Sequence, residues 1–212
     1  MKRFDLSLYL VLDPGLCRVH DMVETARLAV LGGATMVQLR DKQAGTAGLI
    51  ATGRALMSAM AGSNVPVVVN DDVEAACAIG AHGIHVGQDD LPARLVRQRV
   101  GPDMIVGLSA ECESAVRDAE AGIVDYLGLG PVFATPTKAD HKTPIGTDGL
   151  TRLARISPVP SVAIGGIKLD QVALVLRSGV DGLSVVSAIC GQSDPKAAAE
   201  LLSSAIRAHR SV

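Results

Sequence analysis

The sequence predicts an α/β protein of the (β/α)8 class, a TIM barrel with eight parallel strands inside a ring of outer helices. Short runs rich in Val, Leu and Ile recur along the chain, each closely followed by Gly, Asp, Asn or Ser. Segments whose apolar residues have helical spacing separate these runs. The chain has 212 residues, a length that α/β barrels routinely occupy as one unit. We therefore expect a single TIM-barrel domain over residues 1–212.

The expected strands are eight runs, at residues 8–12, 36–39, 66–69, 83–86, 104–108, 124–129, 161–164 and 182–186. Successive runs start from 17 residues (66 to 83) to 37 residues (124 to 161) apart. Each interval can hold a crossover helix, as parallel strands require. The longest interval also contains a long loop after the sixth run.

Helical spacing between the runs is clearest near the two ends of the chain. One such segment carries Val23, Ala26 and Val30, and the last carries Ala198, Leu201, Leu202, Ala205 and Ile206. Both fit the i, i+3, i+4, i+7 pattern of an amphipathic helix. An open doubly wound sheet is the alternative, but such sheets more often use five or six strands, so eight units favour the barrel.

The composition sets limits on the core and on the partners. It is 48% hydrophobic and 20% charged, with two Phe, two Tyr and no Trp, so Ala, Val, Leu and Ile must build the core. The net charge is −2, and Lys and Arg are scattered rather than clustered. We therefore expect no nucleic-acid partner.

The location follows from the cysteines and from the apolar runs. Cys17, Cys77, Cys112 and Cys190 form no CxxC pair and are expected to be free thiols in a reducing compartment. The first run follows Lys2 and Arg3, as in a signal peptide, but it ends at Asp13 without a small-residue cleavage site and is interpreted as a strand. No run approaches the ~18 apolar residues of a membrane span. The expected location is the cytoplasm, without membrane association.

Polar residues gather at the ends of the expected strands, where the reactive groups of a barrel lie. After the second strand, the two-residue period places Gln38, Arg40 and Lys42 on one face. A solvated strand end is the alternative. Cations that point into a barrel mouth need an anion, and the fork of an Arg matches phosphate oxygens.

Carboxylates follow the third and fourth strands. Asp71, with Glu74 three residues later, also fits a capping box, and Asp90 before Pro92 also fits a helix cap. At the ends of adjacent strands, Asp71 and Asp90 together make an oxygen-rich site suited to Mg²⁺. His85 in the fourth strand is expected to be structural, and Ser109 after the fifth is either a turn residue or part of the site.

The later loops carry hydroxyls, glycines and an ammonium group. Residues 128–138 (GLGPVFATPTK) combine Thr135, Thr137 and Lys138 on a loop whose glycines allow close approach, a plausible anion clamp. Gly165-Gly166 and Val186-Ser187 follow the last two strands, the usual phosphate site of this fold, although the glycines could be turn residues. The cations and carboxylates are suited to a metal-bound diphosphate, and the neutral donors of the later loops are suited to a second phosphate. Two phosphorylated reactants are therefore implied.

The ordered motifs resemble the thiamine-phosphate synthase family. They are YLVLD, QLRDK, NDD, GIHVGQDDLP, GLSA, DYLGLGPVFATPTK, AIGGI and GVDGLSVVSAI, and they span residues 9–189. The resemblance implies a Mg²⁺-dependent transferase on a (β/α)8 barrel. It would condense 4-amino-2-methyl-5-hydroxymethylpyrimidine diphosphate with the carboxylated or plain thiazole phosphate, giving thiamine phosphate and pyrophosphate.

The resemblance also implies roles for individual residues. Those that match pyrimidine-diphosphate positions are Gln38, Arg40, Lys42, Asn70, Ser109 and Lys138, of which Arg40, Lys42 and Lys138 would be catalytic. Asp71 and Asp90 match the magnesium ligands. Those that match the thiazole-phosphate site are Thr135, Thr137, Gly166, Val186 and Ser187.

Two positions depart from the family pattern. Leu12 stands where a hydroxyl residue is frequent, and Glu111 where a histidine is common. Two alternative functions remain, a thiazole tautomerase on the same barrel and a non-catalytic phosphate-ligand binding barrel. The expected partners are small phosphorylated substrates, and no pattern indicates an oligomeric state.

Overall fold

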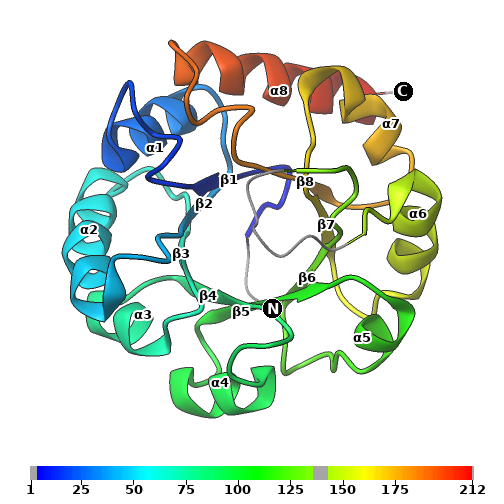
Figure 1. Cartoon of the computed structure of the whole chain (residues 1–212), viewed down its shortest axis with the longest axis horizontal. Helices are drawn as coiled ribbons and strands as arrows, with labels where there is room; N and C mark the ends of the chain where they lie inside the picture. The colour runs from blue at the N-terminus through cyan, green and yellow to red at the C-terminus, as the bar shows by residue number, and fades with distance from the viewer. Residues whose placement is uncertain (1–3, 136–142, 212) are drawn as a thin grey trace.

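The chain folds into a closed barrel with helices outside it. The structure, a computed structural model, describes residues 4–135 and 143–211. In this part of the chain, eight parallel strands close a barrel in sequence order, and helices surround it (Figure 1). The TIM-barrel prediction is confirmed.

The strand bounds agree with the expected runs to within two residues. They are β1 (Leu8–Leu12), β2 (Met36–Leu39), β3 (Val67–Asn70), β4 (Gly83–Val86), β5 (Ile105–Ala110), β6 (Tyr126–Leu129), β7 (Ser161–Ile164) and β8 (Gly182–Val185). β3 and β5 run further toward their carboxyl ends than the apolar runs do. Asn70 and Ser109 pair with neighbouring strands, Asn70 opposite His85 and Ser109 opposite Gly128, so these polar residues belong to the sheet.

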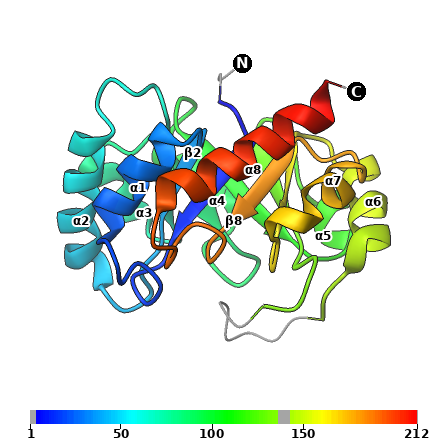
Figure 2. The ribbon, with the colours of Figure 1, turned by 90° about the horizontal axis from the view of Figure 1, so that it is seen from above.

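The helices cover the outer face of the barrel. They are α1 (Met22–Leu31), α2 (Gly45–Ala59), α3 (Val73–Ile79), α4 (Ala93–Val100), α5 (Glu113–Arg117), α6 (Gly146–Ile156), α7 (Val172–Leu176), which follows the short 3-10 turn η1 (Leu169–Gln171), and α8 (Pro195–Arg210). Figure 2 shows α8 lying across the barrel wall. No helix within residues 4–135 and 143–211 combines the length and the apolar character needed to cross a bilayer.

The barrel closes where β8 meets β1, and a glycine makes the approach possible. Leu8 pairs with Leu183 and Tyr9 with Ser184. A Cβ on Gly182 would overlap the backbone of Leu6. A residue with a side chain at this position would therefore force the first and last strands apart.

The buried face of α8 differs in part from its expected stripe. Leu202 and Ile206 are buried, as the spacing predicts, but Leu201 is 58% exposed. A Cβ on Gly32 would meet the Cβ of Ala199 at 2.8 Å, so α8 turns Ala199 toward the end of α1. Helical geometry then points Leu201 outward, and its place in the stripe was wrong.

Two apolar clusters fill the interior, as a barrel requires. The larger lies between strands and helices and is built mainly from Ala, Val, Leu and Ile, as the composition predicts. The smaller fills the floor of the barrel, with Leu6, Tyr9, Met36, Val68, Ile105, Tyr126 and Val162. This floor supports the pocket above it.

The cysteines are free, as predicted, but two of them are neighbours. Cys77 and Cys112 are exposed, whereas Cys17 and Cys190 are buried. The sulfurs of Cys17 and Cys190 lie 3.2 Å apart, between the loops after β1 and β8. The hydrogen bond between the Cys17 and Cys190 sulfurs lowers the pKa of Cys17 to about 7.

Candidate active site

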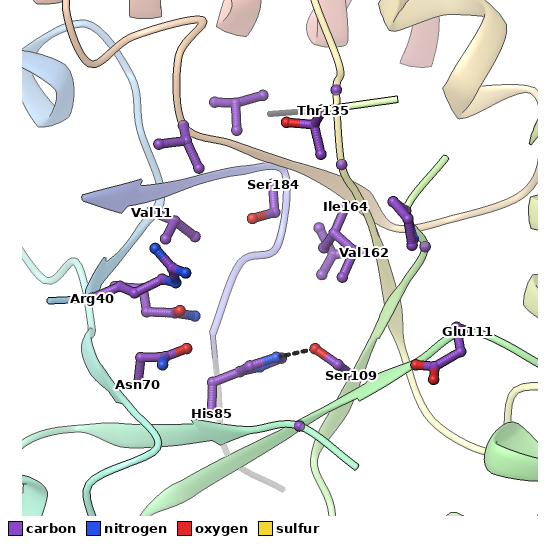
Figure 3. A pocket seen from close by; sticks show the side chains of 18 of the residues that line it. Val11, Arg40, Asn70, His85, Ser109, Glu111, Thr135, Val162, Ile164 and Ser184 are labelled. Carbon is purple, nitrogen blue, oxygen red and sulfur yellow. Dashed lines mark hydrogen bonds between the residues drawn. The ribbon is translucent and has the colours of Figure 1, made fainter. Parts of the chain in front are cut away.

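A pocket of about 530 Å³ opens at the carboxyl ends of the strands, a volume typical of small-molecule sites. Figure 3 shows side chains from several strands pointing into one space. Eleven of the predicted site residues line it: Gln38, Arg40, Lys42, Asn70, Asp71, Asp90, Ser109, Thr135, Gly166, Val186 and Ser187. Thr137 and Lys138 lie outside the described residues. Leu12, one of the two departures from the family pattern, is buried in the outer core, whereas Glu111 lines the pocket.

The end of β2 brings its polar residues into the pocket, as the two-residue period predicts. Gln38 is 4% exposed and Arg40 is 8% exposed, and Lys42 reaches the rim. Arg40 has a partner that spacing alone did not indicate, because its Nη1 lies 2.9 Å from Oδ2 of Asp13 in the loop after β1. Asp13 therefore orients the guanidinium and offsets part of its charge. The remaining guanidinium N–H groups can still donate to an anion.

Asp71 and Asp90 do not cap helices, so the capping interpretations were wrong. Asp72 is the N-cap of α3 and accepts a hydrogen bond from the backbone N–H of Ala75 at 2.7 Å. α4 begins after Pro92 without a side-chain cap, and Asp90 instead accepts the N–H of Gly87 at 2.7 Å. Both carboxylates face the pocket.

The electrostatics of Asp71 reflect its burial and its neighbour. Burial and the hydrogen bond and charge of Asp90 raise the pKa of Asp71 to about 7, while Lys42 acts in the opposite direction. The backbone of Asp71 has φ of 64°, an uncommon conformation for a residue with a side chain. Such strain is often found at functional sites. Two carboxylates held this close disfavour their joint ionisation unless a cation joins them.

The donor set fits Mg²⁺ better than a metal held in an all-protein cage. Among the described residues, no group of three or more His, Cys, Asp or Glu could hold a metal. Mg²⁺ usually takes one or two carboxylates and leaves its other positions to water and substrate phosphate. Asp71 and Asp90 provide such a pair.

Ser109 lies beside a histidine that sequence reasoning left outside the site. His85 is 7% exposed and lines the pocket, and its Nε2 lies 2.9 Å from Oγ of Ser109 (Figure 3). Its Nδ1 lies 2.9 Å from the hydroxyl of Tyr126. The alternation that placed Gln38 inward would also have found His85, since it stands two residues after Gly83, another inward position near Val68.

The loops after β6, β7 and β8 form the opposite wall through their backbones. Gly165 and Gly166 have φ of 93° and 71°. A Cβ on Gly166 would meet the carbonyl oxygen of Ala134 at 2.8 Å. The carbonyls of Ile164 and Gly165 accept the N–H groups of residues 132 and 133, which joins the loop after β6 to β7. Gly166 is therefore required by conformation and by space.

Lys168, which sequence reasoning did not single out, contacts a residue of this wall. Nζ of Lys168, just after β7, donates to Oγ of Ser187 at 2.7 Å. The last loops thus hold one ammonium group near their neutral donors. A single Lys on an exposed turn carries no sequence signal that separates it from a solvated charge.

Comparisons with known proteins match this chain over almost its whole length. The family model described as thiamine monophosphate synthase matches residues 8–189. The chain is 46% identical to thiamine-phosphate synthase of Psychrobacter sp. over 93% of each chain, and 44% identical to that of Xanthobacter autotrophicus over 99% of each.

Among solved structures, it is similar to the thiamine phosphate pyrophosphorylase of Pyrococcus furiosus. The TM-score is 0.88, at 35% identity over 96% of each chain. A 3-hexulose-6-phosphate synthase, at 18% identity and a TM-score of 0.69, shares the fold alone.

Proposed function

The chain belongs to the thiamine monophosphate synthase family, and from this premise we propose how its pocket performs the reaction. Its function is that of a thiamine-phosphate synthase, a transferase of thiamine biosynthesis that joins the pyrimidine diphosphate to the (carboxy)thiazole phosphate. The relatives named above are thiamine-phosphate synthases, so neither the tautomerase nor the non-catalytic barrel is favoured. We propose which metal takes part, which residues hold each substrate and how water is kept from the reaction.

The observation that carries the proposal is the juxtaposition of Asp71 and Asp90 in a pocket that also presents Lys42 and Arg40. Asp71 and Asp90 would hold Mg²⁺, which neutralises charge on a diphosphate when bound. Gln38, Arg40, Lys42, Asn70, Ser109 and Lys138 would bind the pyrimidine diphosphate. Arg40 and Lys42 hold its phosphate groups by charge.

The second substrate would bind on the opposite wall. Gly166, Val186 and Ser187 line the pocket where barrels commonly bind phosphate, and Thr135 lines it from the loop after β6. Thr137 would join this site. The assignment rests on the positive φ of Gly166, which allows the backbone to approach an anion closely.

The chemistry asked of the residues is mainly electrostatic. The bond between the pyrimidine methylene and the diphosphate oxygen breaks, and its electron pair leaves with the diphosphate. The thiazole nitrogen lone pair then forms the new C–N bond to the methylene cation. Arg40, Lys42 and Lys138 stabilise the charge that grows on the leaving group, an effect for which loss of one donor commonly costs ~100 to 1,000-fold in rate.

Positioning and exclusion of water complete the scheme. Holding both reactants in line accelerates the capture of the cation, and a closed pocket protects the cation from hydrolysis. The scheme requires no general base.

A cytoplasmic location and a single domain over residues 1–212 stay predictions.

The test is pyrophosphate release by purified protein given both the pyrimidine diphosphate and the thiazole phosphate, with and without Mg²⁺. We expect release, with an equal amount of thiamine phosphate, only when all three components are present. Protein shown to be folded that releases none would favour the tautomerase or the binding barrel. Release that persists after complete removal of divalent ions would refute the role of Mg²⁺.

A further inference from the structure

A continuous chain of hydrogen bonds, three of them buried and one partly buried, crosses the barrel at the base of the pocket. It runs through five side chains, Gln38, Tyr9, Tyr126, His85 and Ser109, from β1, β2, β4, β5 and β6. Its two ends, Gln38 and Ser109, line the pocket, as Tyr9 and His85 also do, and both tyrosines are essentially fully buried. The three central residues have no role in the reaction described above.

The direction of donation along this hydrogen-bond chain follows from the donors that are available. Nε2 of Gln38 can only donate, and it lies 2.6 Å from the hydroxyl of Tyr9. Tyr9 therefore gives its single proton to its other partner, the hydroxyl of Tyr126, at 2.9 Å. Tyr126, already accepting from Tyr9, gives its own proton to Nδ1 of His85, also at 2.9 Å.

The last hydrogen bond of the series ends at Ser109, which lines the pocket. Because Nδ1 of His85 accepts, a neutral imidazole carries its proton on Nε2 and donates it to Oγ of Ser109, 2.9 Å away. The hydroxyl proton of Ser109 then points to a different acceptor. At the other end, one N–H of the Gln38 amide is engaged with Tyr9, which orients the amide so that its carbonyl oxygen is the acceptor of this side chain and its second N–H a further donor. The hydrogen-bond chain thus begins at an amide whose oxygen accepts and ends at a hydroxyl that donates.

The surrounding sequence makes room for this chain. The inward position on β5 directly before Ser109 is Gly107, and a Cβ there would overlap the Tyr126 hydroxyl and meet Nδ1 of His85 at 2.5 Å. The rings of Tyr9 and Tyr126 belong to the apolar floor, where an unpaired polar group would be costly. No buried side-chain nitrogen or oxygen among the described residues lacks a partner. Among the described residues, these hydrogen bonds therefore join the five groups into one connected set.

We propose that His85, Tyr126 and Tyr9 are positioning residues that fix the amide oxygen of Gln38 as an acceptor and the hydroxyl of Ser109 as a donor for the pyrimidine ring. An aminopyrimidine has the complementary pattern, an amino group that donates on one edge and unprotonated ring nitrogens that accept on others. The proposal rests on the proposed function, since it concerns the ring of the same substrate. A ring with an oxo group and a protonated nitrogen would meet two mismatched contacts, and a buried mismatch of this kind rejects an analogue strongly.

The first experiment reads the proton on His85 directly. Nitrogen NMR of the full chain, labelled at histidine, distinguishes the two ring nitrogens, and a His85→Gln variant assigns the signals. We expect a protonated Nε2 and an unprotonated Nδ1. A proton on Nδ1 would overturn the proposal, because the hydrogen bonds would then be donated in the opposite direction, from Ser109 toward Gln38. This readout needs no substrate, so it is independent of the proposed function.

The second experiment separates recognition of the ring from recognition of the phosphates. The Tyr126→Phe substitution interrupts the hydrogen-bond chain in its middle and leaves the side chains of Gln38 and Ser109 unchanged. The aminopyrimidine alcohol, which lacks the diphosphate, serves as a probe of the ring, and inorganic pyrophosphate with Mg²⁺ as a probe of the phosphate site. We expect the inhibition constant of the alcohol to rise about tenfold or more, as for an unpaired buried polar group, and that of pyrophosphate to change less than about twofold.

Parallel variants guard against a merely structural effect. Gly107→Ala should behave as Tyr126→Phe does, whereas Gly128→Ala adds a methyl group at the neighbouring inward position, 3.3 Å from Cε1 of His85 and away from the hydroxyls, and should have a smaller effect. His85→Gln keeps an N–H group for Ser109 and should retain more ring binding than His85→Leu. Equal losses for both probes, or no loss for the alcohol in a folded Tyr126→Phe protein, would overturn the proposal. Failure of the wild-type chain to release pyrophosphate would instead count against the proposed function.

Discussion

The two walls of the pocket are built by different means. The charged half consists of side chains in or after the carboxyl ends of β2 to β5: Gln38, Arg40, Lys42, Asn70, Asp71, Asp90 and Ser109. The glycine half consists of Gly165, Gly166, Val186 and Ser187 after β7 and β8, where the backbone conformation does most of the shaping. The charged half should therefore lose function when a charge is removed, and the glycine half when an atom is added.

Removing a carboxylate from the charged half should give the largest effect. We expect Asp71→Ala to cut turnover at least ~100-fold, since the charge of the leaving diphosphate would lose its metal. The fold should be retained, because Asp72 and not Asp71 caps α3. Initial rates in saturating Mg²⁺, with circular dichroism, would measure both. Lys138→Ala is expected to have an effect of the same size.

The matched control is Glu74→Ala, which removes an exposed carboxylate three residues away. It should leave turnover within about twofold, as a surface substitution generally does. Near wild-type turnover by a folded Asp71→Ala protein would refute the metal assignment.

Adding one methyl group to the glycine half should give the next largest effect. At Gly166 the φ of 71° disfavours any Cβ by ~1–2 kcal/mol, and the methyl would also meet Cβ of Phe133 at 2.8 Å. We expect Gly166→Ala to raise the KM of the thiazole phosphate about tenfold or more, the factor that corresponds to ~1.4 kcal/mol. The KM of the pyrimidine diphosphate should change little.

Gly179→Ala provides the comparison, because Gly179 also has a positive φ, 87°, but a Cβ there meets nothing within 4 Å. It carries the backbone strain without touching the pocket. If both variants changed the KM equally, strain transmitted through the barrel, and not the shape of the glycine half, would be the cause.

A change of geometry without a change of charge should have an intermediate effect in the charged half. Arg40 uses one nitrogen for Asp13, and the rest of its fork can meet a phosphate group. A lysine is a point charge and cannot do both as well. We expect Arg40→Lys to lower kcat/KM for the pyrimidine diphosphate about tenfold, a plausible cost for one charge-assisted hydrogen bond.

The exposed pair of Arg27 and Glu24 supplies the matched substitution, Arg27→Lys, which should leave kcat/KM unaltered. Steady-state kinetics of both variants would decide the point. Wild-type values for Arg40→Lys would show that charge alone, without the fork, is sufficient at this position.

The smallest expected effect tests whether the glycine half depends on charge at all. Lys168 is exposed and donates to Ser187. We expect Lys168→Gln to raise the KM of the thiazole phosphate about threefold at low salt, and less at high salt, since exposed charges contribute little and are screened. Lys196→Gln, on the exposed surface of α8, should have no effect. A loss above about 30-fold would mean that this half also works by charge.

The same contrast explains how much could be predicted from the sequence. Gln38 and Arg40 could be placed because a two-residue period holds at the end of a strand, and eight apolar runs were sufficient to predict the barrel. The partner of Arg40 could not, because Asp13 is 27 residues away and reaches it only through the conformation of a loop. His85 and Tyr126 are 41 residues apart, and their contact depends on the missing Cβ of Gly107.

The capping patterns failed for a local reason. The pattern of Asp71 with Glu74 three residues later placed the cap at Asp71, whereas α3 begins one residue further on, after Asp72. The positive φ of Asp71, which frees its carboxylate for the pocket, has no signature in composition or spacing. The roles of these residues toward substrate remain predictions for the experiments above.

The most direct test of the two-wall account is calorimetric titration of the wild-type chain with each substrate alone, in the presence and absence of Mg²⁺. If only the charged half holds the metal, Mg²⁺ should lower the Kd of the pyrimidine diphosphate at least about tenfold, which is 1.4 kcal/mol, and leave the Kd of the thiazole phosphate unchanged. A Kd of the pyrimidine diphosphate that does not respond to Mg²⁺ would contradict the two-wall account.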